Sequence, residues 1–282
     1  MHETILIAGA TGATGGATLD ALTKSGGRAA AMTRRTSAPL PAGATRVLAD
    51  FDDGASLSRA LDGVTAAYLV TPSSEAAEEQ QIDFIDRARA AGVEHIVLLS
   101  QLAAADDSPV RFLRYHAAVE AHLLASGIGA TILRPNLFMQ GLFAFRDSIA
   151  AQGAFFAPVG DARVSAVDVR DIGAVAATAL LSSTPLGTLD LTGPEALTHA
   201  EMALALGSAL GKDVVFVNAS PEDFATALAG ILPPWQVAGL VEDYAHYAAH
   251  EAAAVSSDVE RVLGRRPIAF AAFARDHAPD FA

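Results

Sequence analysis

The sequence predicts an α/β protein built on a doubly wound parallel sheet, with a smaller α/β lobe after it. Three observations predict this class: short apolar runs alternate with helical segments, the runs lack internal polar alternation, and the first run opens into regularly spaced glycines. The expected strands after the first lie at 29–33, 45–49, 66–70, 95–100 and 130–134.

The first strand begins at Thr4 and leads directly into three glycines spaced three residues apart, followed by an amphipathic helical segment. Glycine lets backbone N–H groups approach a pyrophosphate closely, and the helix dipole favours its negative charge. A glycine turn without a ligand is the alternative. We expect a dinucleotide to bind at this turn, which comprises Gly9, Thr11, Gly12, Ala13, Thr14 and Gly15.

The end of the second strand distinguishes between the two nicotinamide dinucleotides. NAD-binding proteins usually place an acidic residue there for the ribose 2′-hydroxyl, whereas this chain has Arg34 and Arg35 after Thr33. Guanidinium groups bind a phosphate with paired hydrogen bonds. The pair therefore predicts NADP(H), the alternative being two solvated loop arginines.

Two more strand ends are candidate cofactor contacts. Asp50 follows the third strand and is expected to accept from the adenine amino group, with Phe51 beside the base; alternatively, Asp50 starts the next helix. Thr71 and Pro72 follow the fourth strand and are expected beside the ribose and pyrophosphate. A proline that only stiffens the loop is the alternative there.

The helices between the later strands carry ordinary start and stop signals. One follows Ser74, has acidic residues in its first turn and ends at Gly92, and the next is expected from near Pro109 to Gly127.

Beyond Arg134 the pattern loosens into loops rich in proline and phenylalanine. A strand at 188–192, a capping box formed by Thr198 and Glu201, a strand at 214–218 and a helix start at Ser220 are the clear signals. We predict an NADP-binding domain over residues 1–135 and a substrate lobe over 136–282, with some segments returning to the sheet. The lobe is expected to fold over the carboxyl ends of the strands, where such sheets bind ligands.

The composition excludes several classes of binding partner and of catalytic chemistry. The formal charge is −13 and the pI near 4.9, which argues against direct nucleic-acid binding, and the chain has no cysteine, which excludes disulfides and thiolate catalysis. The early first strand leaves no room for a signal peptide, and no apolar run approaches the length of a membrane span. We expect a cytoplasmic protein without a membrane partner; whether it forms a homodimer stays open.

The histidines do not form a metal-ligand pattern, and we predict no metal. His2, His95 and His199 are widely separated. His246 and His250 are four residues apart on an expected helix, but the glutamate that the zinc-protease motif places after the first histidine is missing. We interpret residues 244–250 as an amphipathic helix face.

Several sequence blocks together resemble the NmrA-like family of atypical short-chain dehydrogenases/reductases, over nearly the whole chain. The blocks are Gly9-Ala-Thr-Gly12-Ala-Thr-Gly15, Asp50-Phe-Asp-Asp53, Leu61-Asp-Gly63-Val64, Ala91-Gly-Val-Glu-His-Ile96, His116-x-x-x-Glu120, Ser126-Gly127, Leu133-Arg-Pro135-Asn-Leu-Phe138-Met139, Val167-Asp168-Val-Arg-Asp171-Ile172 and Leu191-Thr192-Gly193-Pro194. The resemblance implies an NADP-binding Rossmann domain with a small C-terminal substrate lobe. The family includes quinone reductases, reductases of dyes and regulatory members that bind the dinucleotide without turnover, so the resemblance leaves catalysis open.

Typical short-chain dehydrogenases carry Tyr-x-x-x-Lys on the helix after the fifth strand, and this dyad is absent. Alignment on Glu120 puts Phe112 at the tyrosine position and His116 at the lysine position. Tyr115 lies about 100° around the helix from His116 and is more simply a packing residue or a surface hydroxyl. The resemblance implies that His116 hydrogen-bonds the ribose or relays a proton, the alternative being a helical contact with Glu120.

Ser100 ends the fifth strand, where related enzymes present a hydroxyl to the substrate carbonyl; a strand-end cap is its alternative role. After the sixth strand, we assign Pro135 and Asn136 to the cofactor site. The acceptor pocket is expected to be lined by Phe138, Met139, Leu142 and Phe155, an apolar wall that suits a flat aromatic ligand.

Loss of the tyrosine favours acceptors that stabilise negative charge, because water can then protonate the product. We therefore predict an NADP-dependent oxidoreductase that transfers hydride to a quinone or similar conjugated molecule. The alternatives are a non-catalytic NADP(H) sensor acting through a protein partner, and a tailoring reductase of an iminium or enone.

Overall fold

The computed structural model describes residues 4–37 and 39–281, so His2 lies outside the described residues. The chain divides into two compact units. The first contains the described residues up to Ser108 together with 113–134 and 169–190, and the second contains 109–112, 135–168 and the described residues from Leu191 onward. Among the described residues, no helix is both long and apolar enough to cross a membrane.

The first unit is built on a seven-stranded sheet in the order β3-β2-β1-β4-β5-β6-β9. Strands β1 to β6 pair in parallel, and the chain moves outward from β1 to β3 before returning to β4 beside β1. This reversal confirms the predicted doubly wound sheet and creates the switch point at which such sheets bind ligands. The strands are β1 Ile5–Ile7, β2 Ala29–Thr33, β3 Ala44–Leu48, β4 Ala66–Leu69, β5 His95–Leu99, β6 Gly129–Pro135 and β9 Gly187–Leu191.

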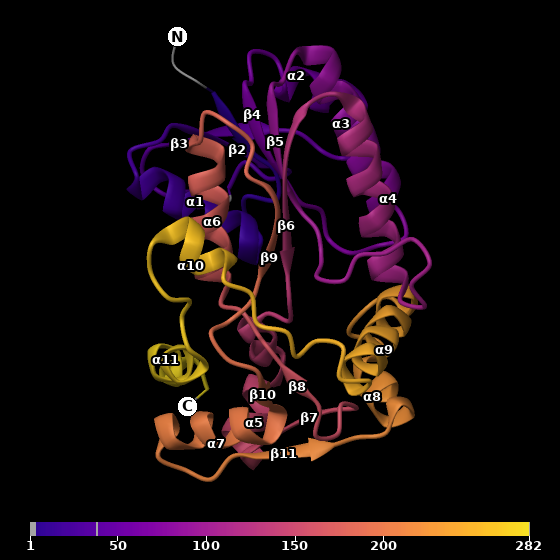
Figure 1. Cartoon of the computed structure of the whole chain (residues 1–282), viewed down its shortest axis with the longest axis vertical. Helices are drawn as coiled ribbons and strands as arrows, with labels where there is room; N and C mark the ends of the chain where they lie inside the picture. The colour runs from indigo at the N-terminus through magenta and orange to yellow at the C-terminus, as the bar shows by residue number, and fades with distance from the viewer. Residues whose placement is uncertain (1–3, 38, 282) are drawn as a thin grey trace. The chain divides into compact units, whose positions relative to one another are not determined.

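Helices cover both faces of this sheet (Figure 1), with α1 and α6 on one side and α3 and α4 on the other. The central strands β1, β4 and β5 are buried along their whole length, which explains why they lack polar alternation. The helices are α1 Ala13–Lys24, α2 Gly54–Ala60, α3 Ala77–Ala91, α4 Arg111–Ser126 and α6 Val169–Leu181.

Helices α1 and α6 pack closely because a glycine lies at their contact. A Cβ built on Gly173 of α6 would lie 2.5 Å from the carbonyl carbon of Ala17 in α1. Only a residue without a side chain fits that spacing, so the position of α1 over the sheet depends on Gly173.

The start of α2 shows that the alternative role of Asp50, as the residue that starts this helix, is wrong. Asp53, not Asp50, caps this helix, and its carboxylate accepts hydrogen bonds from the backbone N–H groups of Ala55 and Ser56. Asp50 lies one turn earlier, and its carboxylate accepts from the backbone N–H of Asp52 at 3.2 Å.

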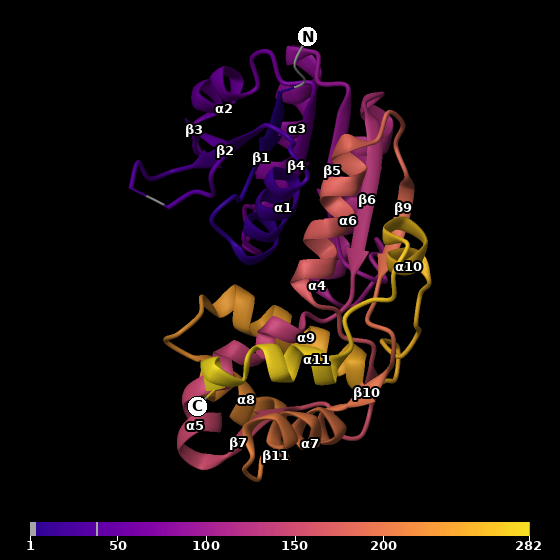
Figure 2. The same cartoon turned by 90° about the vertical axis from the view of Figure 1, so that its left-hand side faces the viewer.

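The second unit is mainly helical, with two small two-stranded sheets. Figure 2 shows α7 lying along β11, which pairs in parallel with β7, while β10 pairs antiparallel with β8. The 3₁₀ segment and α5 occupy a stretch for which the sequence predicts loops. The elements are η1 Met139–Phe145, α5 Arg146–Gln152, β7 Ala154–Ala157, β8 Arg163–Val164, β10 Leu197–Thr198, α7 His199–Leu210, β11 Val215–Asn218, α8 Pro221–Leu228, α9 Pro234–Ala248, α10 Asp258–Leu263, α11 Phe270–Asp276 and η2 Ala278–Phe281.

The predicted helix starts in this unit are confirmed, but the predicted extent of one helix is wrong. Thr198 and Glu201 form the capping box of α7, and Ser220 caps α8. The interpretation of 244–250 as one helix face fails because α9 ends at Ala248. His250 has a φ of 63°, which lies outside the helical region, so it is not one turn beyond His246 on a helix.

Candidate functional site

The space around the backbone differs among the three glycines of the turn between β1 and α1. Gly9 has a φ of 61°, and a Cβ there would lie 2.7 Å from Val70 Cγ1. A Cβ on Gly15 would lie 2.2 Å from the carbonyl oxygen of Gly9, so this glycine lets the helix pack against the end of the strand. Gly12 is different, because a Cβ there would meet only the oxygen of Gly9, at 3.3 Å. Its outer side is open to an approaching group.

The start of α1 is equipped to bind an anion. Gly12 is the N-cap and supplies no side-chain hydrogen bond, so the first helical N–H groups are not capped by the chain. Thr11, Gly12 and Ala13 are exposed, while Thr14 and Gly15 are buried. Exposed N–H groups at the positive end of a helix dipole are the usual binding site for a pyrophosphate.

Arg34 and Arg35 directly follow β2, as predicted. Both are exposed, and neither guanidinium forms an ion pair with another described residue. The backbone at Arg35 is held in place, since its carbonyl accepts from Thr33 Oγ1 at 3.0 Å and from Arg46 Nη1 at 2.9 Å. Two cationic groups are therefore available on an ordered turn.

The next two strand ends hold the other predicted cofactor contacts. Phe51 packs against Phe84 with ring centroids 5.9 Å apart. Thr71 is buried, and its Oγ1 accepts a hydrogen bond of 2.9 Å from Gln81 Nε2, whereas Pro72 is exposed. β1 and β4 are adjacent strands, so Thr71 and the glycine turn follow neighbouring strand ends.

Ser100 forms a hydrogen bond within the protein. Its hydroxyl donates to Glu120 Oε1, and the Glu120 carboxylate in turn accepts from Arg134 Nε at 2.9 Å and from Arg134 Nη2 at 2.5 Å. Because a hydroxyl has one proton, Ser100 cannot donate to a substrate carbonyl while this bond exists. This bond favours the alternative role of Ser100 at the strand end, and its role as a donor to a substrate stays a prediction.

His116 is a buried imidazole on the same helix as Glu120. Its Nδ1 has no hydrogen-bond partner among the described residues, and its ring lies against that of Tyr115 with centroids 4.1 Å apart. Burial lowers the pKa of His116 to about 3, so the ring is neutral at pH 7. No hydrogen bond joins His116 to Glu120, four residues further along α4.

The neighbours of His116 have their own contacts. The hydroxyl of Tyr115 lies 3.2 Å from Ser73 Oγ, and Phe112 packs against Trp235 with ring centroids 5.4 Å apart. Phe112 therefore fills an apolar site at the position where the usual tyrosine would stand.

Asn136 has an internal role that the sequence does not indicate. Its Nδ2 donates to Ser165 Oγ at 2.9 Å and to the carbonyl of Ala252 at 2.8 Å, while its Oδ1 accepts from the N–H of Leu137. The amide therefore joins three segments of the second unit, and no N–H is left to donate to a cofactor. Pro135 beside it is buried at the end of β6.

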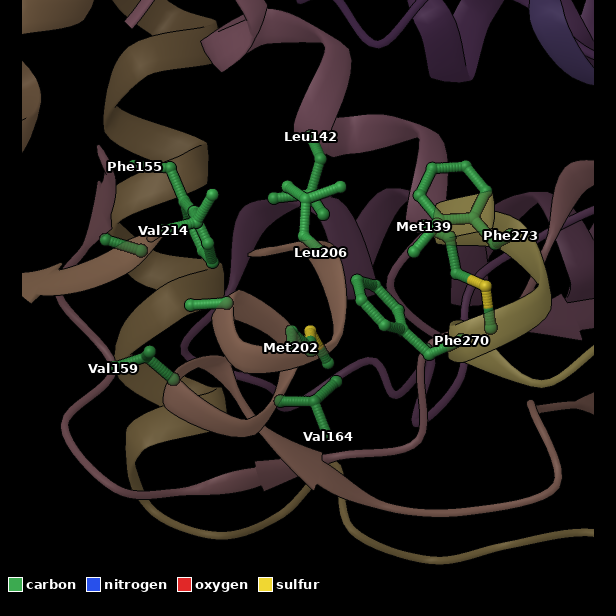
Figure 3. Packing of buried hydrophobic residues seen from close by; sticks show 14 of the residues in the cluster. Met139, Leu142, Phe155, Val159, Val164, Met202, Leu206, Val214, Phe270 and Phe273 are labelled. Carbon is green, nitrogen blue, oxygen red and sulfur yellow. The ribbon is translucent and has the colours of Figure 1, made fainter. Parts of the chain in front are cut away.

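The four predicted substrate residues come together. Phe138, Met139, Leu142 and Phe155 line one cavity in the second unit, with about 360 Å³ of empty space, its open mouth included. Figure 3 shows Met139, Leu142 and Phe155 within the apolar cluster that fills this unit. The cavity is therefore a narrow opening in an apolar core.

Sequence reasoning missed two residues of this cavity, His199 and Tyr244, which are the lining residues with polar side chains. His199 is the first residue of α7, 3% exposed, and its Nδ1 has no hydrogen-bond partner among the described residues. Burial lowers its pKa to about 4 and raises the pKa of Tyr244 above its ordinary value. The capping box beside His199 is visible in the sequence. The pairing of β7 with β11, which joins Phe155 to Phe216 across 61 positions, is not.

Within the part of the chain that the structure describes, no group of three or more histidine, aspartate or glutamate side chains could hold a metal ion.

Comparison with known proteins gives a family and several relatives. Residues 1–266 match the model of the NmrA-like family. The chain is 35% identical over 234 residues to an NAD(P)H azoreductase of Xenophilus azovorans, covering 82% of each chain. It is also 31% identical over 281 residues, 99% of each chain, to a (4-alkanoyl-5-oxo-2,5-dihydrofuran-3-yl)methyl phosphate reductase of Streptomyces griseus.

A solved structure gives the same fold. The NADPH-dependent quinone oxidoreductase QOR2 of Escherichia coli, complexed with NADPH, is 27% identical, with a TM-score of 0.84, over 97% of this chain and 98% of that one.

Proposed function

The chain belongs to the NmrA-like family, and from this premise we propose that it is an NADP-dependent oxidoreductase that reduces quinones or similar conjugated small molecules. The glycine turn is the observation that carries the proposal, because Gly12 leaves open the space that a pyrophosphate needs at an uncapped helix start. The similarity to an NAD(P)H azoreductase and to a quinone oxidoreductase bound to NADPH supports the reaction class.

The residues present fit NADP(H). In this proposal the backbone of the turn from Gly9 to Gly15 binds the pyrophosphate. Arg34 and Arg35 bind the 2′-phosphate, with Asp50 and Phe51 at the adenine and Thr71 and Pro72 beside the ribose. The exposure of both arginines and their lack of ion pairs with described residues support the phosphate assignment, because a bidentate site needs available guanidinium groups.

NADPH supplies the hydride when it is bound. The protein's own contribution is binding, orientation and exclusion of water. In this proposal His116 is a neutral hydrogen-bonding group for the nicotinamide ribose, since its pKa of about 3 excludes a charged imidazolium at neutral pH. The proton that completes reduction of a quinone then comes from water, which the stabilised phenolate-type anion permits.

Ser100, Glu120 and Arg134 are positioning residues in this proposal. The Glu120–Arg134 ion pair joins the middle of α4 to the end of β6, and Ser100, directly after β5, donates to the same carboxylate. These bonds hold the helix that carries His116. The first unit is accordingly the cofactor domain and the second unit the substrate lobe. A cytoplasmic location and the lack of direct nucleic-acid binding are parts of the same proposal, and both rest on the sequence.

The test is oxidation of NADPH, followed at 340 nm, by the purified protein with a panel of quinones, azo dyes, enones and simple ketones. We expect turnover with quinones or azo dyes and little with ketones, which need a positioned acid. Binding of NADPH is measured in parallel by fluorescence. Tight binding without turnover on any acceptor would favour the sensor alternative, which the reductase names of the relatives do not support.

A further inference from the structure

The cavity of the second unit contains a polar group that the protein itself does not use. The wall is apolar apart from His199 and Tyr244. No hydrogen bond joins either imidazole nitrogen of His199, or the hydroxyl of Tyr244, to another described residue, and His199 Nδ1 is fully buried.

Such an imidazole is unusual inside a protein. Buried polar atoms are nearly always hydrogen-bonded, and an unsatisfied one costs about 1–3 kcal/mol. His199 is instead surrounded by aromatic rings, with its centroid 5.2 Å from Phe216, 6.1 Å from Tyr244 and 6.2 Å from Phe155. A hydrophobic side chain would fill this place at lower cost, which points to a partner that comes from outside the chain.

The chemistry of the partner follows from the state of the ring. Burial keeps His199 neutral, so it offers one N–H donor and one acceptor nitrogen but no charge. A neutral donor in an aromatic pocket suits a carbonyl oxygen on a flat ring, whereas a phosphate or carboxylate would require a cation.

We propose that this cavity binds the ring of the acceptor and that His199 donates a hydrogen bond to its carbonyl oxygen, with the Tyr244 hydroxyl as a second polar contact. The inference rests on the proposed function, and it makes His199 a specificity-determining residue. The empty space, its open mouth included, is about 360 Å³, and fourteen mostly apolar residues line it.

The test compares two ligands of the same shape, 1,4-naphthoquinone and naphthalene, which differ in the two carbonyl oxygens. Binding is measured by equilibrium dialysis with saturating NADP⁺, which has no hydride to give. The chain has no cysteine, so the quinone cannot react with a thiol. We expect the protein to bind naphthoquinone about tenfold more tightly than naphthalene, the effect of one good hydrogen bond.

Variants isolate the imidazole. His199→Phe keeps an aromatic ring, and we expect it to lose the tenfold preference while binding naphthalene as before. His199→Gln and His199→Asn restore a polar group at the Nε2 and Nδ1 positions, and one of them should recover most of the preference. Tyr244→Phe removes only a hydroxyl and should weaken naphthoquinone binding about threefold. His277→Phe is the matched control, because His277 lies in the same unit and contacts Phe143 but does not line the cavity.

Parallel assays of NADPH oxidation separate this inference from the proposed function. Naphthoquinone binding that depends on His199, without turnover, would leave the inference standing and reject the oxidoreductase. Turnover with an unchanged Michaelis constant in the folded His199→Phe variant would support the oxidoreductase and reject the role of His199 in acceptor binding. If neither ligand binds, or if His199→Phe, His199→Gln and Tyr244→Phe all bind naphthoquinone like the wild type, the cavity is only a packing space.

Discussion

The two arginines after β2 make the strongest prediction at the scale of single residues. Replacing both, as Arg34→Ala with Arg35→Ala, should raise the dissociation constant of NADPH about 100-fold and change that of NADH less than threefold. The reason is that NADH lacks the 2′-phosphate to which guanidinium groups bind with paired hydrogen bonds. Fluorescence titration of both dinucleotides measures the two constants.

Arg265 and Arg266 supply the control, because they are also adjacent and belong to the second unit. Replacing both with alanine removes the same charge from the molecule, and the affinity for NADPH should stay within a factor of two. An equal loss for NADPH and NADH in the Arg34/Arg35 variant would show that the pair binds no 2′-phosphate.

His116 allows a test in which activity and stability change differently. His116→Phe keeps the ring beside Tyr115 and removes a nitrogen that has no partner among the described residues. We expect kcat to fall at least tenfold and the melting temperature to stay the same or rise, since an unsatisfied buried atom is lost. Steady-state kinetics and thermal unfolding give the two values.

The control for this variant lies on the same helix. His122 is partly exposed and pairs with Asp86 at 2.8 Å, so His122→Phe should leave kcat unchanged. Full activity of His116→Phe would return His116 to a packing role.

At the scale of elements, two neighbouring glycines of α1 should respond in opposite directions to the same substitution. A Cβ at Gly15 would lie 2.2 Å from a backbone oxygen, whereas one at Gly16 would lie 3.5 Å from its nearest atom, an ordinary contact. Gly15→Ala should therefore lower the free energy of unfolding by about 2–4 kcal/mol and weaken NADPH binding. Gly16→Ala should raise it by up to about 1 kcal/mol, because alanine is the better helix former.

Chemical denaturation of the two variants measures both changes. Similar stabilities for Gly15→Ala and Gly16→Ala would mean that α1 shifts away from β1 without cost, and the steric reason given for Gly15 would then be wrong.

Local patterns predicted the strands of the first unit well because the central ones, β1, β2, β4 and β5, are buried along their whole length and therefore lack polar alternation. Strand β2 begins and ends where the sequence indicates, and the others differ by one residue at either end. The glycine turn and the capping box of α7 were also visible, since each depends on residues close together in the chain. The helical stretch from Met139 to Gln152 could not be predicted, because its aromatic residues show no helical period.

The site was harder to predict because its contacts join distant segments. The hydrogen bonds of Asn136 to Ser165 and Ala252 span 29 and 116 residues, and they occupy an amide that sequence position alone assigned to the cofactor. Ser100 and Glu120 were both noted, but not that they bond to each other. His199 gave no local signal, since the rings around it come from β7, β11 and α9.

For the molecule as a whole, the buried histidines predict sensitivity to acid. His116 lies in the first unit and His199 in the second, and burial lowers their pKa values to about 3 and about 4. In the unfolded chain a histidine takes up a proton near pH 6.5, whereas these two stay neutral in the folded protein until much lower pH. Stability is therefore retained above pH 6.5 and lost as the pH falls toward 4.

Each of these histidines should lower the free energy of unfolding by about 2 kcal/mol at pH 5 relative to pH 7. The reason is that its protonation favours the unfolded state by about 1.4 kcal/mol for every pH unit below 6.5. Trp235, the one tryptophan, lies in the second unit, so its fluorescence in urea reports the effect of His199, while circular dichroism follows the whole chain. His199→Phe and His116→Phe should each make the loss between pH 7 and pH 5 shallower by this amount. All carboxylates are unchanged in these variants, so equal slopes in variant and wild type would mean that the imidazoles are protonated in the folded protein.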